Sequence, residues 1–219
     1  MMCRTKRATQ THRAGWLWLA SGCGLAFVGV TLPILLHRNW PGEWIVVQWA
    51  LGTRSPWWTG VMQAITFLGS AAVGAGLSVG CSAALFLGRR RLDRLVWLPL
   101  VAMWGSAPVN FALRAVIGRL RPGVDHIPHF MPEITHPFQR WSYPSGHAMT
   151  ATICYGFLVY LAARAFPKLR VWSLGALALW LLILGFSRVY LGVHWPTDVV
   201  GGCLIGGCWL ALVLAWLGD

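Results

Sequence analysis

Six stretches of this sequence are each long and apolar enough to cross a lipid bilayer as a helix. A spanning helix needs about 20 mainly apolar residues, and hydrophobic residues make up 57% of the 219 residues, against 11% that are charged. A water-soluble chain of this size cannot cover so much apolar surface. The sequence therefore predicts an all-α integral-membrane protein with six transmembrane helices. The six segments are 15–36, 60–87, 93–117, 146–166, 170–191 and 197–217.

The chain has a formal charge of +12, and eleven of its eighteen basic residues lie before the first apolar segment and in alternate connections between the others. Arg119, Arg121, Arg140 and Arg188 break this pattern. A nucleic-acid-binding protein would gather its basic residues on one face or stripe, whereas alternation is typical of cytoplasmic loops under the positive-inside rule. We therefore expect no nucleic-acid partner. The three basic clusters comprise residues 4–13, 89–94 and 164–170.

Placing these clusters in the cytoplasm sets the orientation of every expected helix. Both termini then lie in the cytoplasm as well. The expected location is the cytoplasmic (inner) membrane of a bacterium, and a site in the outer connections would face the periplasm or the exterior. The outer connections are 37–59, 118–145 and 188–196.

The first apolar segment is expected to stay in the mature chain as a membrane helix, because it exceeds the about 7–15 apolar residues of a signal peptide. Residues 1–14 then form a basic cytoplasmic N-terminus, and residues 15–219 form one six-helix membrane domain. Segment 40–58 is rich in Trp, but its Glu43 and Arg54 argue against a seventh span. We expect this segment to lie along the membrane interface.

Three short motifs fall at the outer ends of the expected helices. The first, 114–122, reads RAVIGRLRP and ends the third helix. The second, 144–147, reads PSGH and starts the fourth helix. The third, 187–198, joins the fifth helix to the sixth and contains the pair Ser-Arg followed by HWPTD. Alternating topology brings all three motifs to one membrane face, so we expect them to form one site.

The motifs supply groups suited to an anion. Arg114, Arg121 and Arg188 carry planar forks of donors that match phosphate oxygens. Ser145 adds a hydroxyl donor. Gly146 lets the backbone approach closely, and its N–H lies at a helix start, where free amides and the helix dipole favour an anion. Each residue taken alone has an ordinary structural use, but ionisable residues at a bilayer are costly and point to function.

Two histidines and an aspartate complete the set. His147 and His194 can provide an acid and a nucleophile near neutral pH. Asp198 follows His194 by four residues, a spacing that places two side chains on one helical face. A carboxylate at that place is expected to accept the ring N–H of His194 and leave the other ring nitrogen free to attack.

These motifs resemble those of the phosphatidic acid phosphatase type 2 family, membrane lipid phosphatases of the haloperoxidase-like superfamily. The family signatures are Lys-x6-Arg-Pro, Pro-Ser-Gly-His and Ser-Arg-x5-His-x3-Asp. The second and third match at every fixed position, and the first departs once, where Arg114 replaces the usual Lys. Arg114 keeps the positive charge with a different geometry.

The resemblance implies a phosphatase mechanism that needs no metal or cofactor. His194 attacks phosphorus and forms a phosphohistidine, Asp198 orients His194, and His147 acts as the acid. The phosphoryl oxygens are held by Arg114, Arg121, Ser145, Gly146 and Arg188. The implied partners are a lipid phosphate substrate and membrane lipids, with no obligatory protein partner.

Other functions remain open at the level of sequence. A lipid phosphotransferase would share the phosphohistidine intermediate, and an intramembrane serine protease would use Ser145 as its nucleophile. A lipid-phosphate binder or transporter would release no phosphate from its ligand. The substrates that suit an outward-facing site are undecaprenyl-type pyrophosphates, phosphatidic acid, phosphatidylglycerol phosphate and lipid A phosphates. Carrier-lipid pyrophosphate is the first choice from the sequence alone.

Several further residues fit two interpretations. His126, His129 and His136 lack the acidic or Cys partners of a usual metal site, and a loop at the rim of the site explains them better. Arg119 and Arg140 either extend the positive mouth of the site or meet lipid headgroups.

Overall fold

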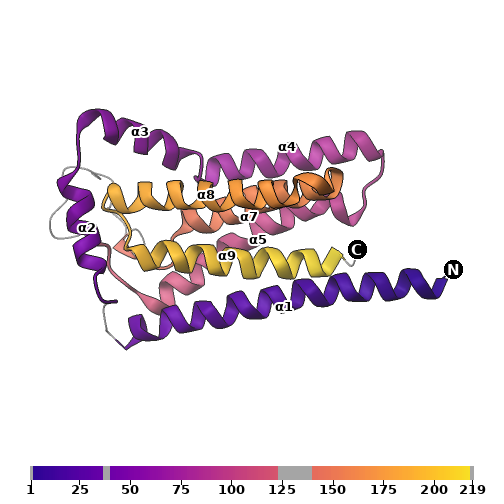
Figure 1. Ribbon diagram of the computed structural model, residues 1–219, viewed down its shortest axis with the longest axis horizontal. Coiled ribbons are helices and arrows are strands. Elements are labelled where there is room, and N and C mark those ends of the chain that lie inside the picture. Colours follow the sequence, from indigo (N-terminus) through magenta and orange to yellow (C-terminus); the bar gives the residue numbers. More distant parts are fainter. Residues whose placement is uncertain (1, 37–39, 123–139, 218–219) are drawn as a thin grey trace.

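The computed structural model describes residues 2–36, 40–122 and 140–217, which form a bundle of helices (Figure 1). Among these residues there is no strand, and one isolated bridge joins Leu120 to Trp141. The all-α prediction is therefore confirmed. The elements are α1 (Met2–Leu35), α2 (Glu43–Gly52), α3 (Pro56–Phe67), α4 (Ala71–Arg89), α5 (Arg94–Ile117), α7 (Gly146–Ala165), the 3-10 turn η1 (Pro167–Leu169), α8 (Arg170–Tyr190) and α9 (Pro196–Leu217).

Six stretches of helix in this part of the chain are long and apolar enough to cross a membrane, as predicted. Exposed apolar side chains cover them, such as Leu25 at 75%, Val116 at 79% and Leu182 at 71% exposure. Surfaces this apolar are stable only against lipid. The chain is therefore a multi-pass membrane protein.

The second span differs from the expected continuous helix over 60–87, because it consists of α3 and α4 with a break between them. Ser70 caps α4 by accepting a hydrogen bond from the N–H of Val73 at 3.3 Å. Gly69 lies against α8, where an added Cβ would come within 2.6 Å of Cδ1 of Leu184. A capping serine beside a closely packed glycine explains why the helix restarts here.

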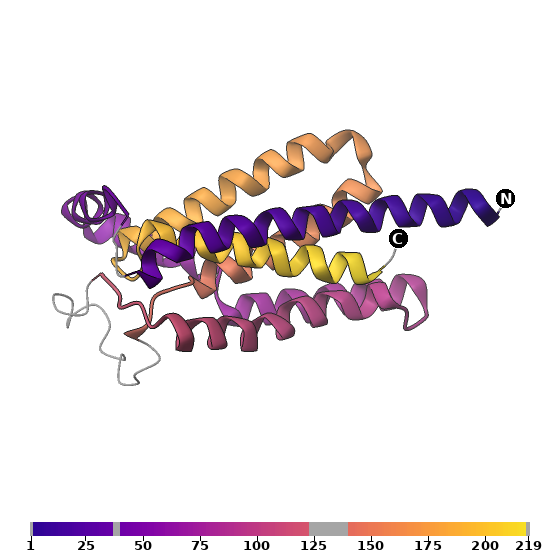
Figure 2. The ribbon, with the colours of Figure 1, turned by 90° about the horizontal axis from the view of Figure 1, so that it is seen from below.

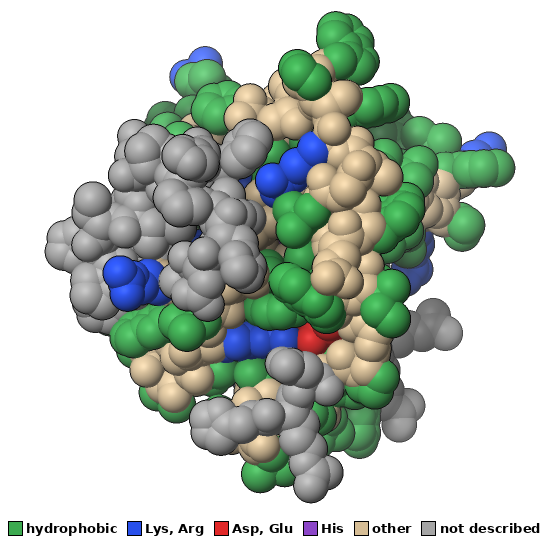
Figure 3. Space-filling view, turned by 90° about the vertical axis from the view of Figure 1, so that its left-hand side faces the viewer, with side chains coloured by type: hydrophobic (Ala, Val, Ile, Leu, Met, Phe, Trp, Pro, Cys, Tyr) green, Lys and Arg blue, Asp and Glu red, His purple; other side chains and the backbone are tan. Residues whose placement is uncertain are grey.

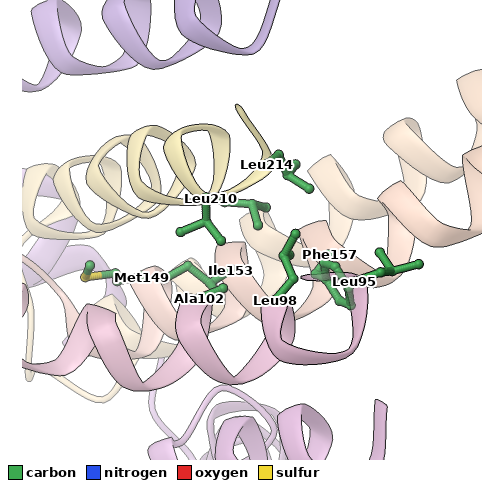
Figure 4. Packing of buried hydrophobic residues seen from close by; sticks show 9 residues of the cluster. Leu95, Leu98, Ala102, Met149, Ile153, Phe157, Leu210 and Leu214 are labelled. Atoms are coloured by element: carbon green, nitrogen blue, oxygen red, sulfur yellow. The ribbon is translucent and has the colours of Figure 1, made fainter. Parts of the chain in front are cut away.

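The buried core lies where α5, α7 and α9 meet. Figure 4 shows Leu98 and Ala102 of α5 next to Ile153 of α7 and Leu210 of α9. Helix α1 packs along α9, and Figure 2 shows α8 on one side of this pair and the α4–α5 hairpin on the other. Helix α7 is thus enclosed, and its first turn carries the second motif.

The two ends of the bundle differ in character. Both termini lie at one end, together with the α4–α5 and α7–α8 connections that hold two of the basic clusters (Figure 1). Helix α2 lies across the opposite end, roughly perpendicular to the long helices. Its Trp44 and Trp49 side chains are 43% and 59% exposed. The expectation that segment 40–58 does not form a seventh span is confirmed.

Candidate active site

The three motif regions meet at the end of the bundle that carries α2. The first motif ends α5 and continues beyond it, the second starts α7, and the third runs from α8 through residues 191–195 into α9. The backbone N–H of Ser145 donates to the carbonyl of Asp198 at 2.9 Å, which joins the second motif to the third. The structure thus brings together the segments that the topology was expected to bring together.

His194 and Asp198 form a buried pair. Nδ1 of His194 lies 3.2 Å from Oδ2 of Asp198, and the two residues are 1% and 0% exposed. The same carboxylate oxygen accepts the N–H of Trp195 at 2.9 Å, so Asp198 also closes the first turn of α9. With the ring proton on Nδ1, Nε2 keeps its lone pair and faces Nη1 of Arg121 at 3.5 Å.

The surroundings of His194 keep its ring neutral. Burial lowers the pKa of His194 well below its ordinary value, and the positive charges of Arg121, Arg188 and Arg114 lower it further, with His147 adding to the effect. A neutral imidazole is the form that can attack an electrophile. The environment therefore favours the reactive form of this side chain.

Two arginines of the first motif are anchored by backbone carbonyls. Arg121 donates from Nη1 to the carbonyl of Val193 at 2.6 Å, and Arg114 donates from Nε to the carbonyl of Pro144 at 3.2 Å. Burial lowers the pKa of Arg121 to about 10, the nearby charge of Arg114 lowers it too, and Asp198 opposes the shift. Positive charge is therefore concentrated here, as a site for an anion requires.

Arg188 enters the same site from α8. Its Nη1 donates to the hydroxyl of Thr66 at 2.6 Å. Its Nε is buried and has no hydrogen-bond partner among the residues that the structure describes. A buried donor without an acceptor is costly, so a phosphoryl oxygen at this place would stabilise it.

The start of α7 is packed tightly against the other motifs. Ser145 is fully buried and caps α7, its hydroxyl accepting the N–H of Ala148 at 3.5 Å. A Cβ on Gly146 would lie 3.4 Å from Nη2 of Arg114, so the helix start and this guanidinium are close neighbours. His147 occupies the first turn and is half-buried. All eight residues singled out from the sequence lie in this region.

Arg119 has neither of the two roles considered from the sequence. Its side chain is 8% exposed, and it forms ion pairs with Glu43 at 2.7 Å and with Asp198 at 2.8 Å. Sequence reasoning took Glu43 only as evidence against a membrane span. The sequence does hold a signal for Glu43 as a residue of the site: it is an acidic residue in an apolar segment of a chain that has only six acidic residues.

The remaining candidates are less informative. His126, His129 and His136 lie outside the described residues. Arg140 has an exposed side chain, and its carbonyl accepts the N–H of Arg121 at 3.2 Å.

A cavity of about 310 Å³ opens beside the second motif, between α4, α5 and α7. Gly146, His147 and Arg114 line its inner end. Its outer lip includes Ala107 and Phe111, which are exposed on a membrane-spanning part of α5. The cavity therefore connects the polar site with the lipid-facing surface.

Comparisons with known proteins agree with this geometry. A sequence model of the PAP2 superfamily matches residues 95–219, which include all three motifs. Phosphatidylglycerophosphatase B of Bacillus subtilis is 34% identical over 159 residues, covering 70% of this chain and 72% of that protein. An undecaprenyl-diphosphatase of Sulfolobus acidocaldarius is 40% identical over 73 residues, covering 33% of this chain and 32% of that protein.

A solved structure extends the likeness to nearly the whole chain. The crystal structure of a transmembrane PAP2-type phosphatidylglycerolphosphate phosphatase from Bacillus subtilis matches with a TM-score of 0.74 and 30% sequence identity. The match covers 90% of this chain and 94% of that one. The spans outside the motif region therefore share the same arrangement.

Proposed function

Because this chain belongs to the PAP2 superfamily and is a membrane-bound lipid phosphatase, we propose that it works through a phosphohistidine on His194. The observation that carries the proposal is the pairing of Nδ1 of His194 with Asp198 at 3.2 Å, while Nε2 faces Arg121. This arrangement leaves one ring nitrogen to attack and surrounds it with donors for the phosphoryl oxygens.

The reaction proceeds in two steps. First, the Nε2 lone pair of His194 forms a bond to phosphorus while the bond from phosphorus to the lipid oxygen breaks, and His147 gives its proton to that oxygen. Second, water attacks phosphorus, its proton passes to His147, and the N–P bond breaks to release phosphate. Asp198 keeps the Nδ1 proton throughout. The phosphoryl oxygens are bound by Arg114, Arg121, Arg188, the Ser145 hydroxyl and the Gly146 N–H.

Positive charge for the transition state comes from the arginines, and no step uses a metal. Arg114 replaces the lysine of the family signature, but its anchoring to the carbonyl of Pro144 keeps a guanidinium beside Gly146. We expect Arg114 to bind the phosphoryl group through Nη1 or Nη2, since its Nε already donates to the carbonyl of Pro144.

The lipid portion of the substrate lies in the cavity beside His147. The apolar lining from Ala107 and Phe111 suits hydrocarbon, while the inner end carries the acid and a cation. A leaving oxygen placed between these two regions meets His147, and the chain attached to it reaches the membrane.

The enzyme acts on a phosphate at the outer surface of a bacterial cytoplasmic membrane. Support comes from the basic connections at residues 89–94 and 164–170, which lie at the same end as both termini, whereas the site lies at the other end. Under the positive-inside rule the basic end is cytoplasmic, so the site faces the periplasm or the exterior.

Phosphatidylglycerol phosphate is the substrate to test first. The phosphatidylglycerol phosphate phosphatases of Bacillus subtilis match over most of their length at 30% identity or more. A lipid A 4'-phosphatase of Bacteroides thetaiotaomicron matches over a similar share of its length at 28% identity, and the undecaprenyl-diphosphatase matches over about a third. Undecaprenyl pyrophosphate, phosphatidic acid and lipid A phosphates follow as alternatives. Family membership and the capping role of the Ser145 hydroxyl argue against the serine protease considered from the sequence.

The decisive experiment measures phosphate release by the purified full-length protein in mixed micelles, across these four lipids. We expect turnover of at least one lipid and none by His194→Ala, provided that this variant elutes as the same folded species. Turnover by His194→Ala equal to wild type would contradict the proposal. Water labelled with heavy oxygen separates hydrolysis from transfer. A hydrolase incorporates the label into the released phosphate, whereas a phosphotransferase passes the phosphoryl group to another acceptor without incorporating the label.

A further inference from the structure

Arg119 joins two acidic side chains that come from distant parts of the chain. Its Nη1 contacts Oδ1 of Asp198 at 2.8 Å, and its Nη2 contacts Oε2 of Glu43 at 2.7 Å. The two oxygens of Asp198 therefore have separate tasks, since Oδ2 accepts from His194 and from the N–H of Trp195. Arg119 holds the oxygen that His194 does not use, and this contact limits rotation of the carboxylate.

The three charges are almost completely removed from solvent. The side chains of Arg119, Glu43 and Asp198 are 8%, 4% and 0% exposed. Buried charges are stable only when each is paired and hydrogen-bonded. Arg119 also lies over the ring of Trp195 at 5.0 Å, which holds its guanidinium in place beside the chain that carries His194.

Glu43 ties α2 to the start of α9. Its Oε1 accepts the N–H of Thr197 at 3.1 Å and also the Thr197 hydroxyl. Its Oε2 accepts the N–H of Trp40 at 3.3 Å. A carboxylate bound to the first turn of a helix also interacts favourably with the helix dipole. Helix α2, which lies across this end of the bundle, is thereby fastened to the turn that presents the histidine (Figure 1).

We propose that Glu43 and Arg119 are positioning residues, which act through Asp198 to hold His194 in the orientation for attack. The proposal rests on the role of His194 proposed above. Neither residue binds substrate, because both guanidinium ends of Arg119 are taken by acids, whereas Nη1 of Arg121 lies beside Nε2 of His194. Figure 3 shows this end of the molecule, where a basic side chain lies directly against an acidic one.

A positioning role predicts a loss of turnover without a loss of substrate affinity. At metal sites, removing a group that orients a ligating side chain typically costs about 10- to 100-fold in activity, and we expect a group that orients a nucleophile to matter as much. We therefore expect Arg119→Ala to lower kcat by about 10- to 100-fold, while KM for a short-chain lipid phosphate changes by less than about threefold. Glu43→Gln keeps an oxygen for Thr197 but removes the charge that holds Arg119, and we expect a smaller fall in kcat.

The closing experiment combines these changes with Asp198→Asn. If Arg119 acts through Asp198, then Arg119→Ala lowers kcat in the wild-type background but has no further effect beside Asp198→Asn. Arg91→Ala is the matched control, since it removes an exposed arginine at the opposite end. Size-exclusion profiles and thermal midpoints are compared for every variant. If Arg119→Ala does not fold, Arg119→Lys and Glu43→Gln carry the same comparison.

Two results would overturn the inference. One is a rise in KM of about tenfold or more at unchanged kcat, which would make Arg119 a substrate-binding residue. The other is an undiminished fall in kcat in the Asp198→Asn background, which would mean that Arg119 acts independently of Asp198. Failure of His194→Ala to lose activity would instead contradict the proposed function, so the two failures are distinguishable.

Discussion

The hydroxyl of Thr66 accepts a 2.6 Å hydrogen bond from Nη1 of Arg188 across the packed ends of α3 and α8. Thr66 is next to last in α3, just before the break at Gly69 that divides the second span. A continuous helix over 60–87 would carry the chain past this point without the turn. The break therefore helps to place a hydroxyl where it holds an arginine of the candidate active site.

Thr66→Val should weaken phosphate binding, because it keeps the shape of the side chain and removes the acceptor. Leaving a charged donor without this partner costs about 1 kcal/mol or more, so KM should rise by about three- to tenfold. Thr66→Ser retains the hydroxyl and should stay near wild type. Steady-state kinetics on a short-chain lipid phosphate check both. Equal KM values for the Val and Ser variants would show that the bond does not support binding.

The pH dependence should report the charge around His194. Burial and the nearby arginines lower its pKa, so the neutral form persists below the ordinary value of about 6.5. Arg121→Gln removes one like charge, which makes protonation of His194 easier and raises its pKa. The acid limb of kcat/KM should therefore move to higher pH in this variant, even though overall activity falls.

Measuring the wild type and Arg121→Gln on one substrate separates the shift in the pKa of His194 from titration of the substrate, which is common to both proteins. Arg91→Ala, at the far end of the bundle, should leave the acid limb in place. An acid limb in Arg121→Gln at the same or lower pH would contradict the assigned electrostatic influence of Arg121.

Gly202→Ala should destabilise the fold and the site together. An added Cβ would clash with the carbonyl oxygen of Ser145 and lie 3.3 Å from the N–H nitrogen of Met149, so α7 and α9 would have to separate. Overpacking of this kind costs about 1–3 kcal/mol. Gly175→Ala is the control, since nothing lies within 4 Å of its added Cβ. We expect a lower thermal midpoint for Gly202→Ala alone, and equal midpoints would refute the close packing.

The spans and the three motifs were predictable because apolar length and short spacings are local properties of a sequence. The pairing of His194 with Asp198 followed in the same way from a separation of four residues. The contact of Glu43 with Arg119 joins residues 76 positions apart, and that of Thr66 with Arg188 joins residues 122 apart. No local pattern encodes such pairs, since they depend on how the helices pack.

The break in the second span was missed for a related reason. Residues 60–87 carry no charged side chain, and glycine and serine are common in membrane helices. What ends α3 is the contact of Gly69 with Leu184 of α8, together with capping by Ser70. The burial of Arg119 was also beyond sequence reasoning, because an arginine at a helix end can equally reach the lipid headgroups.

The cavity beside His147 gives a test of how the lipid is held. Ala107 lies at its exposed lip, on the part of α5 that faces the membrane. Ala107→Trp places a large ring there and should obstruct a hydrocarbon chain without touching the residues proposed to bind phosphate. We expect KM for a long-chain lipid phosphate to rise by about tenfold, equivalent to about 1.4 kcal/mol, with little change for a substrate whose chains are too short to reach the lip.

Ala176→Trp is the matched control, because Ala176 is also exposed, on the lipid-facing surface of α8, and does not line the cavity. It should leave both KM values unchanged, which separates obstruction of the cavity from a general effect of one more tryptophan in the membrane. Equal losses for long and short chains in Ala107→Trp would mean that the ring disturbs Arg114 or His147 instead. No loss for either chain length would mean that the lipid reaches His194 by another route.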